Sequence, residues 1–326
     1  GNGVPQDYAQ AVHWYRKAAE QGFANAQYAL GHRCSNGQGV PEDDGQAVFW
    51  WRKAAEQGHA GAQNFLGMSY AKGLGVPQDD EQAILWLRKA AEQGFATAQN
   101  NLGLGYARGK GVPQDYEQAA FWWRKGAEQG YASAQYNLGW CYDNGHGAPE
   151  DDAQAAVWYR KAAEQGHASA QFCLGYSYLH GEGVEKDAAK AAHWFRKAAE
   201  QGHAEAQRHL ALCHEEGNGV PEDDAQADVW FRKAAAQGDA EAQYHLGLCY
   251  EEGNGVPQDD EQAAVWYHRA AVQGHSEAQY HLGRCYAEGI GAPQDDEQAV
   301  HWFRKAAEQG HEQAISMLRE LGQEAP

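Results

Sequence analysis

The apolar residues of this 326-residue chain repeat with a period of 36 along its whole length. Tryptophan marks the repeat nine times, at positions 14, 50, 86, 122, 158, 194, 230, 266 and 302. Glycine recurs in the same register, from Gly22 and Gly58 on to Gly310, and no insertion or deletion interrupts it. A fixed period of this length indicates stacked supersecondary units, none of which can bury its own apolar face alone.

One half of each repeat has the pattern of an amphipathic helix. After Pro41, Asp43 predicts the N-cap of a helix, and Gln46 three residues later can complete a capping box. Apolar residues at positions 47, 50, 51, 54 and 55 then fall on one helical face. Because the repeated tryptophan lies in this stripe, we expect it in the core. Gly58 supplies the left-handed conformation with which helices often end.

A second helix follows directly, with Ala62, Leu66 and Tyr70 on one face. Gly67 beside the leucine predicts close approach of a neighbouring helix. A glycine-rich run over 73–77 then turns the chain into the next repeat. The short connection between the helices predicts antiparallel neighbours. The same pattern in every repeat gives about 18 helices and no strand signal.

A glutamine also recurs beside the apolar stripe, as in Gln27 and Gln63. We expect it to bond with the backbone or the next helix rather than with a ligand. The last repeat departs from the pattern, because Ile315 replaces this glutamine and Arg319 replaces a glycine. Since no further helix has to pack there, residues 311–326 are predicted to form a C-terminal capping helix and tail.

The charge of the chain narrows the classes of partner. It has 45 acidic and 26 basic side chains, which gives a net charge of −19. This field repels phosphate backbones and anionic lipid, and so argues against nucleic acid and membrane surfaces as partners. No apolar run approaches the roughly 18 residues needed to span a bilayer. Because the chain opens inside a repeat and without Met, we expect that an N-terminal segment has been removed.

The combined pattern Ala-x-Ala-Gln-x-x-Leu-Gly-x-x-Tyr, followed by Gly-Val-Pro-x-Asp-x-x-Gln-Ala-x-x-Trp, is almost complete between Ala132 and Gly166. It resembles the Sel-1-like repeat, a relative of the tetratricopeptide repeat, over essentially all of residues 1–326. The resemblance implies an all-α fold, a right-handed α-solenoid superhelix of antiparallel helix pairs in one domain of nine repeats. It also implies an adaptor or scaffold, with an exported or periplasmic location in bacteria. Some relatives are toxin-neutralising immunity proteins of bacterial envelopes.

Two variable positions on the Leu-Gly-x-x-Tyr helices are candidates for partner binding, since packing fixes the other positions. By the resemblance both face a concave groove, and aromatic residues there are typical of binding hot spots. The candidates are Tyr28, His32, Met68, Tyr136, Trp140, Phe172, Tyr176, Arg208, Tyr244, Tyr280 and Arg284. The predicted apolar anchor consists of Tyr136, Trp140, Phe172 and Tyr176. The alternative interpretation is that these aromatic residues only pack against adjacent repeats.

Charge varies along the same helices. The early helices offer Lys72 and Arg108, whereas the later ones are rich in glutamate, including Glu216 and Glu252. We hypothesise that the C-terminal half of the groove takes a basic segment of the partner, with electrostatics speeding the encounter and selecting the partner. The alternative is a solvated acidic face.

A pattern of Glu-x-x-x-His-x-x-x-Cys in three successive repeats suggests a metal site. This spacing aligns the three side chains on one helix face, and imidazole with thiolate suits zinc or copper(I). The candidate ligands are His209, Cys213, His245, Cys249, His281 and Cys285. Neighbouring sets repeat by translation, roughly 10 Å apart in normal helix packing. The favoured interpretation is therefore buried cysteine beside polar histidine, with no metal and no cofactor.

No catalytic motif is complete. Ser69 and Lys72 match the Ser-x-x-Lys of penicillin-recognising enzymes, but Lys-Thr-Gly and Ser-Asp-Asn are absent. We therefore predict a protein that is not an enzyme, a protein–protein interaction scaffold that binds a partner protein or peptide in its groove. A bacterial toxin-neutralising immunity protein and a metal-binding repeat protein are the alternatives, and the sequence does not set the oligomeric state.

Overall fold

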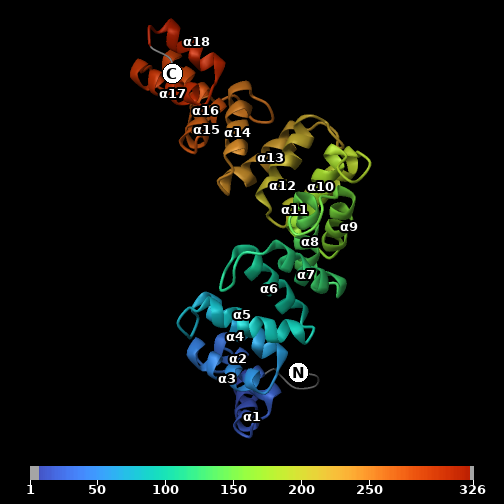
Figure 1. Ribbon diagram of the computed structural model, residues 1–326. Helices are drawn as coiled ribbons and strands as arrows, with labels where there is room; N and C mark the ends of the chain where they lie inside the picture. Colours follow the sequence, from blue (N-terminus) through green and yellow to red (C-terminus); the bar gives the residue numbers. More distant parts are fainter. Residues whose placement is uncertain (1–6, 324–326) are drawn as a thin grey trace. The chain divides into compact units, whose positions relative to one another are not determined.

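A computed structural model describes residues 7–323 of the chain (Figure 1). Every regular element within this range is an α-helix, as predicted. The first of two compact units ends at Gln165 and contains α1 (Tyr8–Glu20), α2 (Ala24–Ser35), α3 (Asp44–Glu56), α4 (Ala60–Lys72), α5 (Asp80–Glu92), α6 (Ala96–Arg108), α7 (Tyr116–Glu128), α8 (Ala132–Asn144) and α9 (Asp152–Glu164). The second begins at Gly166 and contains α10 (Ala168–His180), α11 (Ala188–Glu200), α12 (Ala204–Glu215), α13 (Asp224–Ala236), α14 (Ala240–Glu252), α15 (Asp260–Val272), α16 (Ser276–Glu288), α17 (Asp296–Glu308) and α18 (Glu312–Glu320). That residues 1–326 act as one domain stays a prediction.

Two kinds of helix alternate along the chain. The odd-numbered helices carry the repeated tryptophan and are called Trp helices here, whereas the even-numbered helices carry a buried leucine and are called Leu helices. The nine leucines of the second kind are Leu30, Leu66, Leu102, Leu138, Leu174, Leu210, Leu246, Leu282 and Leu318. Within each unit every helix packs on the next one along the chain. The helix pair is thus the structural unit that the repeat encodes.

The Trp helices start at the predicted aspartate. The Asp43 carboxylate accepts the backbone N–H of Gln46 at 2.9 Å, and Asp79 and Asp151 cap their helices in the same way. The other half of the predicted capping box is wrong. The N–H of Asp43 donates to the Cys34 carbonyl of the preceding Leu helix at 2.9 Å, so it is not left for the glutamine side chain. This bond ties each connecting loop to the helix before it.

Glycine is required at two kinds of position. Gly58 has a φ of 88°, and beside it the N–H of His59 reaches back to the Ala54 carbonyl, which closes the C-terminus of α3 as predicted. Gly67 permits the predicted close contact between α4 and α5. A Cβ atom there would lie 2.8 Å from Leu87 Cγ. This Leu helix therefore presses its glycine directly against the following Trp helix.

The repeated tryptophan is less buried than expected. Trp50, Trp122 and Trp302 are buried, but the other six are half-buried or exposed, and Trp14 is 61% exposed. The fully buried side chain is instead the next residue, as in Trp123. Trp122 packs on the apolar core that α5 contributes to, and no helix precedes α1 in the described residues to do the same for Trp14. In every repeat a Lys or Arg three residues later covers the indole face.

The recurring glutamine forms a buried hydrogen-bond ladder, as expected. In α4, Gln63 donates to the Ala55 carbonyl at the end of α3 at 3.1 Å. Its own side-chain oxygen accepts from Gln93, after α5, at 2.7 Å. Gln93 also donates to the Lys89 carbonyl, which fixes its orientation. Each such glutamine therefore joins the Trp helix before it to the Trp helix after it.

The ladder recurs four times in each unit. The cross-repeat bonds are Gln57 to Gln27, Gln93 to Gln63, Gln129 to Gln99 and Gln165 to Gln135 in the first unit. They are Gln201 to Gln171, Gln237 to Gln207, Gln273 to Gln243 and Gln309 to Gln279 in the second. The ladder ends at α18, where Ile315 is half-buried and Arg319 is exposed. That residues 311–326 act as a cap stays a prediction.

We expect Gln63→Leu to lower the stability of the chain by about 1–3 kcal/mol, because it leaves the buried Ala55 carbonyl without a donor. The midpoint of urea unfolding, followed by circular dichroism, measures this. Gln46→Leu is the matched control, because the Gln46 side chain is exposed and should change stability by less than about 0.5 kcal/mol. Equal midpoints for the two variants would contradict a stabilising role of the ladder.

Candidate functional site

The predicted binding residues reach the surface, but most of them also contact other residues of the chain. Tyr176 is 38% exposed, and Glu216 and Glu252 are also exposed. The half-buried members are Tyr28, His32, Met68, Tyr136, Trp140, Phe172, Arg208, Tyr244, Tyr280 and Arg284. All of them lie on Leu helices or directly after one. In each Leu helix the buried leucine is thus a framework residue, whereas the variable positions reach the surface.

The predicted apolar anchor is divided between the two units. Tyr136 and Trp140 lie on α8 in the first unit, whereas Phe172 and Tyr176 lie on α10 in the second. Within the first, Trp140 stacks on His146 with ring centroids 5.0 Å apart. Within the second, Phe172 and Tyr176 are in contact, with centroids 6.3 Å apart. That the four residues act as one anchor stays a prediction.

Aromatic residues two positions before the leucine stack on a histidine of the next Leu helix. Tyr28 stacks on His59 at 4.4 Å between centroids, and Tyr244 stacks on His275 at 4.8 Å. The pairs Phe172–His203 and Tyr280–His311 repeat the arrangement.

Each of these histidines is the N-cap of its helix. For example, His275 Nδ1 accepts the N–H of Ala278 at 3.1 Å, which fixes the ring. Packing between repeats therefore accounts for one face of these aromatic rings, and it holds the half-exposed remainder in a defined position.

The two arginines of the second unit that were predicted to bind a partner both form ion pairs within the chain. Arg208 Nε lies 3.3 Å from Asp239, and Arg284 Nε lies 3.3 Å from Glu288. In contrast, Glu216 and Glu252 are exposed and form no ion pair among the described residues. The carboxylates, rather than the arginines, are therefore available to an outside partner.

The carboxylate of Glu251, next to Glu252, is bound within the fold. It accepts a hydrogen bond from the Tyr267 hydroxyl and lies 3.3 Å from His281 Nδ1. These bonds, that of His281 first, lower the pKa of Glu251 to about 2, although burial opposes the shift. Burial first, and then the hydrogen bond to Glu251, raises the pKa of Tyr267. Glu251 therefore links α14 to α15 and α16.

The Glu-His-Cys pattern does not converge on a metal site. Glu241 lies 3.8 Å from His245 but closer, at 3.0 Å, to His275 of the next Leu helix. Burial raises the pKa of Cys249 to about 12, and the pKa values of Cys213 and Cys285 are raised in the same way. Burial also lowers the pKa of His209 to about 4. Among residues 7–323, no three His, Cys, Asp or Glu side chains are placed to hold a metal ion.

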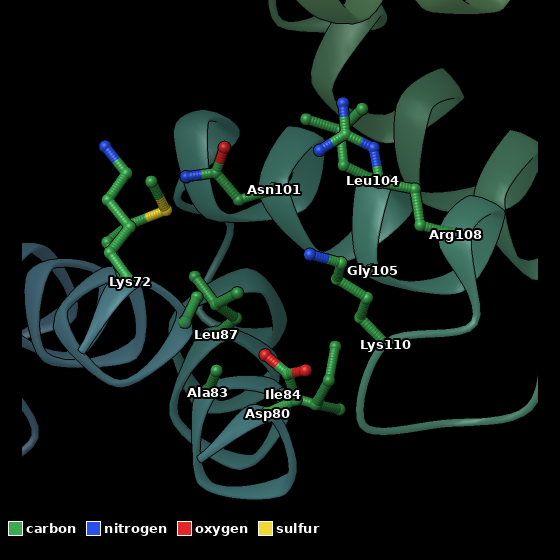
Figure 2. A pocket seen from close by; sticks show the side chains of 12 residues that line it. Lys72, Asp80, Ala83, Ile84, Leu87, Asn101, Leu104, Gly105, Arg108 and Lys110 are labelled. Carbon is green, nitrogen blue, oxygen red and sulfur yellow. The ribbon is translucent and has the colours of Figure 1, made fainter. Parts of the chain in front are cut away.

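A hollow in the first unit was not predicted as a site from the sequence, although Met68 lines it (Figure 2). It has a volume of about 220 Å³ and lies among α4, α5 and α6, with Ile84 and Leu87 in its floor. Its rim contains Lys72 from the end of α4 and Arg108 from the end of α6.

The sequence signal for this hollow was Gly105, where the neighbouring repeats have Ser69 and Cys141. A Cβ atom at Gly105 would clash with Ile84 Cδ1. The missing side chain therefore leaves room for the larger isoleucine beside the hollow.

Repeated helix pairs with a fixed framework and a variable exposed surface define a repeat protein of the tetratricopeptide-like class. The sequence profile of the Sel1 repeat matches nine times, over residues 1–23, 24–59, 60–95, 96–131, 132–167, 168–203, 204–239, 240–275 and 276–311. The chain belongs to the Sel1 repeat family. Members are generally protein-interaction scaffolds, and their fold is generally non-catalytic. No helix in residues 7–323 is long and apolar enough to cross a membrane.

Solved structures similar to this chain include two that match almost all of it. One is a protective antigen of uropathogenic Escherichia coli strains, with 41% identity and a TM-score of 0.87 over 95% of this chain and 67% of that one. The other is a Sel1 repeat protein from Oxalobacter formigenes, with 38% identity and a TM-score of 0.68 over 98% and 94%. An immunity protein from Pseudomonas aeruginosa matches at 21% identity and a TM-score of 0.40, which carries no functional argument. A comparison with curated sequences gave no significant match.

The low pKa of Glu251 predicts a pH-dependent contribution to stability. Because the pKa is about 2 in the folded chain against an ordinary value of 4.5, the stabilisation is present above pH 4.5 and is lost as the pH falls toward 2. The difference in urea midpoint between wild type and Glu251→Gln should therefore shrink over this range, for as long as the chain stays folded. The exposed Glu252→Gln is the control and should have little effect at any pH. A Glu251→Gln difference that is independent of pH would contradict the assignment.

Proposed function

We propose that this chain is a non-catalytic scaffold that holds a partner protein on the exposed parts of its Leu helices. The observation that carries the proposal is the contrast within each of these helices. Leu174, for example, is fully buried, whereas Tyr176 two residues later is 38% exposed. Large aromatic side chains that neighbouring rings hold in place and that remain partly exposed can bind a partner with little loss of conformational entropy.

The second unit favours a partner with a basic segment. Glutamate occupies the end of three successive Leu helices or the residue after it, at Glu216, Glu252 and Glu288. The first two form no ion pair among the described residues, and Glu252 accepts only a neutral hydrogen bond from the Asn254 side chain at 2.7 Å, so a lysine or arginine of the partner meets no competing cation. Such rim charges mainly speed association and select the partner, while the aromatic residues supply affinity.

The Ser-x-x-Lys match of Ser69 and Lys72 does not support a serine hydrolase. Ser69 is buried in α4, whereas Lys72 is exposed at its end and borders the hollow described above. Ser69 and Lys72 both line a neighbouring hollow of about 400 Å³, but Lys-Thr-Gly and Ser-Asp-Asn are absent, so the serine hydrolase motif set is incomplete. The Ser-x-x-Lys match reflects the repeat pattern, in which Tyr70 is the recurring tyrosine.

We expect the full chain, immobilised and exposed to lysate of its native host, to retain a protein that the variants Trp140→Ala and Tyr176→Ala release. Loss of either half-exposed aromatic residue should reduce retention about tenfold or more if these residues are hot spots. Quantitative mass spectrometry of the eluate measures the retention. Phe49→Ala, which removes a 46% exposed aromatic residue from a Trp helix, is the control. A partner retained equally by all forms would contradict the proposal.

Charge reversal tests the basic segment separately. We expect Glu216→Lys with Glu252→Lys to slow association of the same partner, most clearly at low salt, because the rim attraction becomes repulsion. Glu200→Lys with Glu308→Lys makes the same change of net charge at exposed ends of Trp helices in the second unit. Surface plasmon resonance measures the association rates. Equal rates for the two double variants would show that the acidic face is only solvated.

A further inference from the structure

The hollow of the first unit has a charge opposite to that of the chain. Three cationic residues line it, Lys72, Arg108 and Lys110, against the single carboxylate of Asp80. The chain as a whole has a net charge of −19. None of the three cations forms an ion pair within residues 7–323, and all three are exposed. Three cations against one carboxylate leave an excess of positive charge around the hollow, which attracts an anionic ligand to this place.

The cations stand on two sides of an apolar floor. Figure 2 shows Lys72 at one side of the hollow and Arg108 with Lys110 at the other, with Leu87 and Ile84 between them. Lys72 ends α4 and Arg108 ends α6, so the two helix ends form opposite rims.

The same helix position has different charges in the two units. The residue is Lys72 at the end of α4 and Arg108 at the end of α6, but Glu216, Glu252 and Glu288 in the second unit. The backbone positions are equivalent by the 36-residue repeat, so packing does not demand either charge. This cationic pair therefore distinguishes the first unit from the acidic surface of the second.

Taken by itself, the first hollow is smaller than a site for a small-molecule cofactor. Its volume of about 220 Å³ is below the roughly 300–1,000 Å³ of small-molecule sites. A second hollow of about 400 Å³ shares Met68, Lys72 and Asn101 with the first and includes Phe65 in its lining. The two hollows therefore adjoin at residues of α4 and α6.

We infer that this hollow binds an acidic segment of a partner protein, with an aliphatic or aromatic side chain seated on Ile84 and Leu87. The carboxylates on either side of this side chain form ion pairs with Lys72 and Arg108. The guanidinium group of Arg108 can hold a carboxylate with two parallel hydrogen bonds. The inference rests on the proposed scaffold function and adds the chemistry of the segment that the first unit takes.

The two methionines of the chain provide a direct test. Met68 lines the hollow, whereas Met317 lies on α18 in the other unit. In the full chain labelled with ¹³C at the methionine methyl groups, Met68→Leu assigns the two resonances. We expect a short amidated peptide with a central Phe between Glu residues to shift the Met68 signal and leave that of Met317 in place.

The matched peptides separate charge from apolar contact. Replacing the Glu residues by Gln or Lys, or the Phe by Gly, should remove the Met68 shift. Reversing the rim with Lys72→Glu and Arg108→Glu should weaken the acidic peptide about tenfold or more at low salt. Arg16→Glu with Lys186→Glu, both exposed and outside the hollow, makes the same change of net charge and should keep the affinity.

Several outcomes would overturn the inference. These are an equal shift with the Gln or Lys peptide, an equal shift of both methionines, no shift with the acidic peptide, or a phosphoserine peptide without Phe that binds as well as the acidic one. The variant with Glu216→Lys and Glu252→Lys should still show the Met68 shift. The result for the first unit can therefore be interpreted even if the basic-segment proposal for the second unit fails.

Discussion

The structure depends on the buried glutamine that links three successive helices. Gln63 donates to the end of α3 and accepts from Gln93 after α5, so one amide satisfies groups of two repeats at once. A buried amide left with one partner missing costs more than an apolar residue in the same place, which makes the repeat spacing strict. This explains why the 36-residue register runs without insertion or deletion, and why the ladder stops where Ile315 replaces the glutamine.

The sequence predicted the framework well because each of its positions obeys a local rule. Asp43 caps a helix, Gly58 ends it, and Gly67 leaves room for Leu87, all within one or two repeats of sequence. The exposure of Trp14 was not predictable from its stripe, since the burial of this tryptophan position depends on packing against a preceding helix, and the described residues contain none before α1. The second half of the capping box failed because the N–H of Asp43 finds a partner in the previous helix, a contact that no local pattern reveals.

The candidate site was only partly predictable for a related reason. The variable positions on the Leu helices could be read from the register, but their partners within the fold could not. Stacking of Tyr244 on the N-cap His275 and the bond between Tyr267 and Glu251 each join residues of different helices. The place of Ile84 in the hollow beside Met68 depends on the absence of a side chain at Gly105, which in the sequence is one glycine among 39. Function in this fold lies in departures from the repeat, and their meaning depends on contacts across helices.

The central claim is that a partner protein contacts the Leu helices and not the Trp helices. A photo-crosslinking amino acid placed at Leu104 or Leu248 in the chain, expressed in its native host, tests this directly. Leu85 and Val265, each 44% exposed on a Trp helix, are the matched controls. The account predicts a discrete crosslinked protein from the Leu helices and none from the controls. Crosslinks of equal yield from Leu85 and Val265, or none from Leu104 and Leu248, would contradict it.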